Sequence, residues 1–147
     1  MPTAIGNLVY SVRDMGLILK DTLEREQSAL GLEAVYFGST LVPTYPAAVV
    51  EIGSKVRSFQ DAASRFEIDF TIYINLLHSK IQDGSTSYDE AARLAEGMEE
   101  VLHADYTLGG RVIFGMVTRS TPGVVRAASV MLRAFRLRWE GTSKEGF

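Results

Sequence analysis

Hydrophobic and polar side chains alternate almost without fault along residues 65–77, RFEIDFTIYINLL. Successive side chains of a β-strand point to opposite sides of a sheet, so this stretch predicts a long strand with one apolar and one polar face. The apolar positions are Phe66, Ile68, Phe70, Ile72, Ile74 and Leu76. The polar positions are Glu67, Asp69, Thr71, Tyr73 and Asn75. We expect the apolar face to form part of the core.

A second alternating stretch lies near the C-terminus, at residues 131–139, and has the opposite charge. Arg136 and Arg138 stand there where the first stretch has acids. We expect this last strand to continue to residue 140. An earlier strand is predicted at residues 111–119, and the sequence Ser-Thr-Pro-Gly at residues 120–123 predicts a turn between the two.

The N-terminal third combines a helical pattern with short apolar segments. A capping-box-like start at Ser11, followed by apolar residues at helical spacing, predicts an amphipathic helix over residues 12–29. Two short strands are expected next, at residues 32–37 and 47–52, separated by a segment that contains two prolines. Residues 53–64 are polar and lack a clean period, which predicts a long loop or hairpin tip.

A second amphipathic helix is predicted in the acid-rich middle of the chain. Ser87 and Glu90 form a capping box, and apolar residues continue at helical spacing to about Ala104. The order of elements is typical of an α+β fold, with a mainly antiparallel sheet flanked by two amphipathic helices and with long loops or hairpin tips. The 147 residues suit one domain, with residues 1–10 and 141–147 as tails.

Charge is distributed unevenly along the chain. Residues 61–105 contain ten acids and three basic residues, whereas residues 126–147 contain five basic residues and two acids. Cross-strand pairing within one subunit would explain this asymmetry, because such pairs commonly stabilise sheets. Complementary surfaces on neighbouring subunits would explain it equally well. The net charge of −3 argues against a general nucleic-acid binder, whose affinity comes from neutralising phosphates.

Signatures of catalysis and of metal binding are missing from the sequence. The absence of cysteine excludes disulfides and thiolate metal sites. The chain has no GxxxxGK[ST], GxSxG or HExxH motif, and His78 and His103 stand alone near predicted element ends. We therefore expect no enzyme and no cofactor. No signal peptide or membrane span is predicted, so we expect a soluble protein made in the cytoplasm.

Several polar segments are candidates for contact with other proteins. Tyr73 lies on the polar face of its strand, and tyrosine is enriched at protein interfaces. Residues 42–46, 54–64 and 80–87 are expected to be exposed contact loops. The candidate contact residues within these loops are Tyr45, Lys55, Arg57, Phe59, Gln82 and Asp83.

The order of elements, together with four stretches, resembles the small tail-terminator (tail-completion) proteins of long-tailed bacteriophages. The stretches are LVPTYPAAVVEI, RFEIDFTIYI, YDEAARLAEGMEEVLHA and RAFRLRWEGTSKE, and the resemblance covers residues 12–144. It implies a virion protein of the neck, made in the host cytoplasm, that forms a homo-hexameric ring on the tail tube. Such a ring ends tube growth and joins the tail to the head-completion (stopper) protein, with DNA passing transiently through it.

A closed ring requires heterologous interfaces, in which one edge of a subunit meets a different edge of the next. We hypothesise that the acidic and the basic strand regions are these two edges. The candidate interface residues are Asp61, Glu67, Asp69, Tyr73, Arg133, Arg136 and Arg138. Two alternatives remain open: another phage neck or minor tail joining protein, and a cytoplasmic α+β ligand-binding module that dimerises through its sheet. A small hydrolase is disfavoured because the sequence offers no nucleophile with a base.

Overall fold

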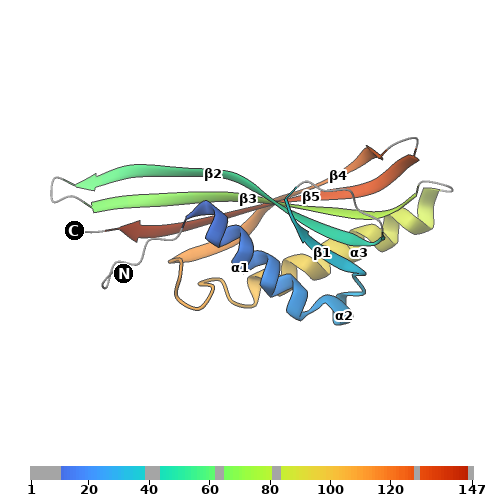
Figure 1. Ribbon diagram of the computed structural model, residues 1–147, viewed down its shortest axis with the longest axis horizontal. Coiled ribbons are helices and arrows are strands. Elements are labelled where there is room, and N and C mark those ends of the chain that lie inside the picture. The colour runs from blue at the N-terminus through green and yellow to red at the C-terminus, as the bar shows by residue number, and fades with distance from the viewer. Residues whose placement is uncertain (1–10, 39–43, 62–64, 81–83, 128–129, 146–147) are drawn as a thin grey trace.

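The computed structural model describes residues 11–38, 44–61, 65–80, 84–127 and 130–145 (Figure 1). Its helices are α1 (Val12–Arg25), α2 (Gln27–Leu30) and α3 (Gly84–His103). Its strands are β1 (Ala34–Phe37), β2 (Ala47–Asp61), β3 (Arg65–Lys80), β4 (Phe114–Ala127) and β5 (Val130–Glu145). The helices lie on one side of the sheet, and the predicted α+β class is confirmed.

The five strands form one sheet in the order β1-β2-β3-β5-β4. Only β1 and β2 pair in parallel, and the other three pairings are antiparallel. The two alternating stretches of the sequence are therefore β3 and β5, which lie side by side in the middle of the sheet. They are not the edges of the subunit, so the hypothesis that placed acidic and basic strands at opposite edges is wrong on this point.

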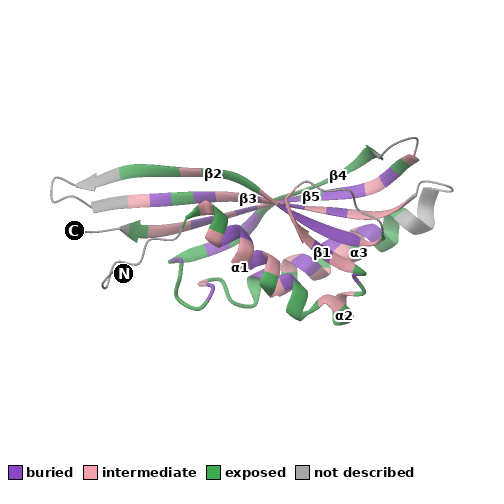
Figure 2. Cartoon of the chain, viewed as in Figure 1, coloured by how far each residue is buried: buried purple, intermediate pink, exposed green. Residues whose placement is uncertain are grey.

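The core lies between the sheet and the two longer helices, as the burial colours of Figure 2 show along β3 and β5. The alternation predicted for β3 is confirmed at Ile68, Phe70, Ile72, Ile74 and Leu76, all of which are buried. The buried side chains that face them come from both helices and from β5: Met15, Leu19, Leu23, Met98, Leu102, Leu137 and Trp139.

The start of the first helix follows the sequence prediction closely. The Ser11 hydroxyl accepts a hydrogen bond from the Asp14 N–H at 3.0 Å, and the Asp14 carboxylate accepts one from the Ser11 N–H at 3.3 Å. This reciprocal capping box satisfies two amide donors that the helix itself leaves unpaired. The predicted helix is interrupted at Glu26 and ends at Gly31, whose φ of 82° suits glycine.

Three of the predicted loops or tails are strands. Of the predicted loop at residues 53–64, residues 53–61 belong to β2 and residues 62–64 lie outside the described part of the chain. The predicted turn at residues 120–123 lies inside β4, and residues 141–145 of the predicted tail extend β5. Each stretch is polar or carries glycine or proline, yet each is held by pairing with a long neighbouring strand.

The second long helix begins earlier than its capping box predicts. α3 starts at Gly84, so Ser87 lies inside the helix and is not its N-cap. Residues 84–87, the last four of the contact loop predicted at residues 80–87, therefore belong to α3. Lys80, the first residue of that predicted loop, is the last residue of β3. Gln82 and Asp83, the two contact residues predicted there, lie outside the described residues. The predicted C-terminal end of this helix, near residue 104, is confirmed.

Candidate functional site

The sheet face that points away from the helices gathers most of the polar residues singled out in the sequence. Residues directly opposite each other on paired strands share a face. One cross-strand row on this face runs from β2 through β3 and β5 to β4: Glu51, Tyr73, Arg138 and Arg119. The adjacent row on the same face is Val49, Asn75, Arg136 and Thr121. Tyr73, Arg136 and Arg138 are thus brought together within one subunit.

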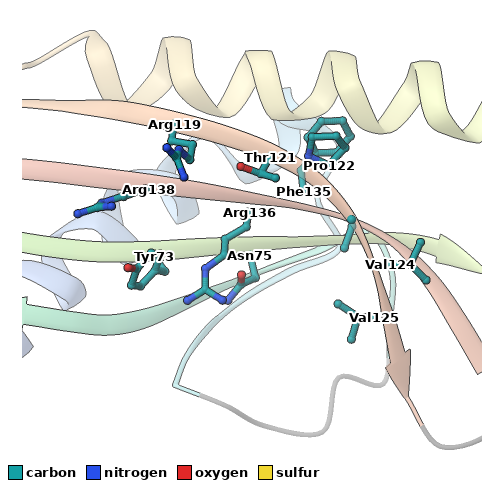
Figure 3. A pocket seen from close by; sticks show the side chains of 12 residues that line it. Tyr73, Asn75, Arg119, Thr121, Pro122, Val124, Val125, Phe135, Arg136 and Arg138 are labelled. Atoms are coloured by element: carbon teal, nitrogen blue, oxygen red, sulfur yellow. The ribbon is translucent and has the colours of Figure 1, made fainter.

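A groove of about 390 Å³ lies on this face, over β3, β5 and β4 (Figure 3). The guanidinium carbon of Arg136 lies 3.9 Å from the centre of the Tyr73 ring, a cation–π contact that fixes both side chains. Arg138 forms an ion pair with Glu140 at 3.5 Å. The walls that β4 contributes are partly apolar, through Pro122, Val124 and Val125. We name this feature the arginine groove, after Arg119, Arg136 and Arg138.

The acidic candidates lie away from this groove or are already bonded. Asp69 accepts a hydrogen bond from the Thr142 hydroxyl at 2.7 Å, and Thr142 is its direct neighbour on β5. Glu67 stands opposite Lys144. Asp69 and Arg136 therefore do not pair within one subunit, because Arg136 is six residues from Thr142 along β5. Pairing between subunits stays a prediction.

Arg133 does not belong to the groove. Its side chain lies on the helix side of β5, where its guanidinium carbon is 5.3 Å from the centre of the Tyr88 ring on α3. Arg136 is three positions further along the strand, so the two side chains project from opposite faces of β5. The predicted interface set is therefore divided between the two faces of the sheet.

The sheet has two open edges on opposite sides. β1 pairs only with residues 47–50 of β2, so residues 51–61 have no strand beyond them in the described part of the chain. β4 is the other edge strand. We call these two stretches the β2 edge (residues 51–61) and the β4 edge (residues 118–127). Large apolar side chains are exposed on both, namely Ile52, Val56, Val124 and Val125.

The first residues of β4 are covered on their outer side, which is why the β4 edge begins at residue 118. The N–H of Gly115 donates to the Tyr106 carbonyl, and the N–H of Val117 donates to Nε2 of His103, each at 2.8 Å. Asp105 holds the loop before β4 in place. Hydrogen bonds from the Thr107 hydroxyl and the Gly109 N–H lower the pKa of Asp105.

The predicted contact residues are only partly where the sequence placed them. Lys55 and Arg57 lie on the β2 edge instead of in a loop, and both point to the helix side of the sheet, opposite Phe70 and Ile68. Tyr45 is half-buried and precedes β2. The backbones of Phe59 and Asp61 also belong to β2, but their side chains lie outside the described part.

Sequence reasoning did not identify the residues of β4 that line the groove, although it predicted a strand at residues 111–119. Arg119, Thr121 and Val125 line the groove, and none of them had been singled out. One signal was available in Pro122, which follows a β-branched stretch. Proline lacks the N–H that a central strand must donate, so a proline within a strand-like pattern indicates an edge strand.

His78 gives the fold a dependence on pH. Burial lowers the pKa of His78 below its ordinary value of 6.5, with Glu90 opposing and Arg133 reinforcing the effect. The folded state therefore binds a proton at His78 more weakly than the unfolded state does. The full stability of the fold is present above the unfolded-state pKa, where His78 is neutral in both states. We expect the free energy of unfolding to fall as the pH drops through 6.5 toward the lower folded-state pKa. Urea titrations at pH 7.5 and pH 5.5 measure this.

His78→Gln is the matched variant for this titration, because it keeps a polar side chain that does not titrate. His103 is present in both proteins, so the difference between their pH profiles isolates His78. Equal loss of stability on acidification in the two proteins would contradict the assignment.

The described ranges contain no cluster of three or more histidine, aspartate or glutamate side chains placed to hold a metal ion. Within the same ranges, no helix has the length and apolar character needed to cross a membrane. Comparison with protein-family models gives no match, and comparison with curated proteins gives none either. The groove and the two open edges are therefore the features from which function has to be inferred.

Proposed function

We propose that this protein is a tail terminator of a long-tailed bacteriophage, whose subunits close into a six-membered ring on the tail tube. The observation that carries the proposal is the pair of different open edges on opposite sides of one sheet. A ring needs such a pair, because each subunit must offer one surface to the preceding copy and another to the next.

The strand directions suit this arrangement. Three antiparallel pairings separate β2 from β4, so these two strands run in opposite directions within the sheet. A β4 edge placed beside the β2 edge of the next copy therefore continues the antiparallel sheet, without any copy being turned over. The same rotation from each copy to the next, repeated six times, would then close the ring.

Charge disfavours pairing of the β4 edge with itself. This edge carries Arg119 and Arg126 and no acid. If residues 118–127 paired antiparallel with the same residues of a second copy in full overlap, Arg119 would stand opposite Arg126. Like charges directly opposite each other destabilise a strand pair.

The β2 edge disfavours self-pairing for the same reason. In full antiparallel overlap of residues 51–61 with themselves, Glu51 would stand opposite Asp61 and Lys55 opposite Arg57. Pairing of the β2 edge with the β4 edge avoids both conflicts. Heterologous contact is thus favoured over the twofold contact that a dimeric ligand-binding module would use.

The remaining partners belong to the same proposal. β2 ends and β3 begins at one end of the long sheet, and β4 ends and β5 begins at the other (Figure 1). A terminator meets the tail-tube protein on one side and the stopper protein on the other, and the two separated ends of the sheet offer one surface for each contact. DNA would pass through the ring, and the assembled protein would belong to the virion.

Native mass spectrometry and negative-stain electron microscopy of the purified protein, alone and with polymerised tail-tube protein, test the proposal. We expect six copies of the 16.2 kDa chain in a ring, seated at the end of a tube that then stops growing. A twofold dimer that neither forms a ring nor alters tube length would refute the terminator proposal and favour the dimeric module.

A further inference from the structure

We infer that the β2 edge of one copy adds antiparallel onto the β4 edge of the next copy, beside the arginine groove. This inference rests on the proposed ring, and it specifies which strands meet and in which register. The occupant of the β4 edge is thus a second copy of this chain. Addition of an extended strand to an open sheet edge is a general mode of recognition in which backbone hydrogen bonds supply affinity and alternate side chains supply specificity.

The register is limited by what already covers β4. Tyr106 and His103 occupy the outward N–H groups of Gly115 and Val117, so an added strand cannot take these donors without displacing them. Beyond the bulge between Val117 and Arg119, no such cover exists in the described residues. Addition is therefore directed to residues 118–127.

The two edges differ in length by one residue, and their pairing requires a stagger. The β2 edge spans residues 51–61 and the β4 edge spans residues 118–127. Within one subunit, however, the cross-strand row that starts at Glu51 reaches β4 at Arg119, and the row that starts at Val56 reaches it at Phe114. A neighbouring copy must therefore be shifted along the strand direction for its β2 edge to lie beside residues 118–127. Closing a sheet into a barrel-like ring requires a stagger of this kind.

The side chains of the β2 edge suit the groove. Ser54, Val56 and Ser58 stand opposite polar-face residues of β3, so they project on the groove side of the sheet. Lys55 and Arg57 project on the other side and bring no positive charge to the groove arginines. In full overlap, with residue 61 opposite residue 118, Val56 falls opposite Gly123, between Thr121 and Val125 on the groove side. Its side chain is 52% exposed in the free subunit, and that of Val125 is 41% exposed.

Disulfide trapping tests this register, because the chain has no cysteine and every crosslink must form between introduced residues. Val56→Cys is mixed with Gly123→Cys, where an added Cβ meets no atom within 4 Å, in the presence of tail-tube protein, and then oxidised. The control partner is Met116→Cys, which is exposed and lies on the same strand but in its covered part. A disulfide forms only when the two Cα atoms lie within about 7 Å.

We expect a linked pair with Gly123→Cys, which a reductant separates, and none with Met116→Cys. Rings that form without the Gly123→Cys crosslink, or that crosslink through Met116→Cys, would overturn the inferred register and leave the terminator proposal standing. Crosslinks at Gly123→Cys in open chains that never close or cap a tube would support the strand pairing and refute the ring.

Discussion

Replacement of Gly141 by alanine is expected to lower the free energy of unfolding by about 1–3 kcal/mol, the usual cost of overpacking a core. The reason is the position of Trp139, whose indole lies across the backbones of two glycines. A Cβ added at Gly141 would come within 2.2 Å of the Trp139 ring, and one added at Gly115 within 2.3 Å. Separations this short require the ring or the backbone to move.

Movement of the ring is restricted from every side. Trp139 is completely buried, and it belongs to the core cluster together with Ile72 and Val117, its direct neighbours on β3 and β4. Gly115 and Gly141 stand directly opposite each other on paired strands, so they form one flat slot for the indole. The close packing of protein interiors leaves no free volume for a displaced indole.

Gly123→Ala is the matched control, since Gly123 also lies in β4 and a Cβ there meets no atom within 4 Å. We expect its unfolding free energy to stay within about 0.5 kcal/mol of the parent, as for most exposed substitutions. Trp139 is the single tryptophan of the chain, so its fluorescence reports directly on the slot during urea denaturation. Equal stability of Gly141→Ala and Gly123→Ala would show that the slot can relax.

The sequence predicted those elements whose pattern is set by burial on one face. The strict alternation in β3 and the apolar stripe of α1 reflect burial against the core, and both predictions are confirmed at Ile72 and Met15. The capping box at Ser11 was also predictable, because its hydrogen bonds join residues three positions apart. Local interactions of this kind can be recognised in one chain segment alone.

The errors concern stretches whose structure depends on distant partners. Residues 53–58 lack periodicity because they are largely exposed on both faces of the sheet, and only pairing with β3 keeps them extended. Gly53 is needed at a bulge there, where a Cβ would lie 2.5 Å from the Thr71 carbonyl oxygen. Pro122 indicated a turn, but within one subunit an edge strand accommodates its missing N–H, because an edge strand has a partner on one side only.

The candidate site could be predicted only in part for a similar reason. Tyr73, Arg136 and Arg138 were found from their polar face, whereas Arg119 and Val125 were not. Strand order decides which residues meet across a sheet, and the chain does not show that β5 separates β3 from β4. The same missing information led the charged strands to be placed at the subunit edges.

The double variant Val124→Lys, Val125→Lys is expected to raise the protein concentration required for assembly by about 10-fold for each interface. Both valines are about half exposed in the free subunit, and an added strand would bury the remainder. Loss of about 0.7 kcal/mol of burial at each position amounts to about 1.4 kcal/mol, which corresponds to a factor of ten. Natural proteins use edge lysines in this way to prevent strand addition.

Met131→Lys separates an edge effect from a simple change in surface charge. Met131 is 43% exposed, close to the 49% and 41% of the two valines, but it lies on the interior strand β5, where it already pairs with Arg126 of β4. We expect Met131→Lys to assemble like the parent, and both variants to unfold at the parent urea concentration. Sedimentation velocity over a range of concentrations, with and without tail-tube protein, measures the difference. If the double variant assembles normally, the β4 edge is not the contact between copies. If Met131→Lys fails as well, added positive charge alone accounts for the loss.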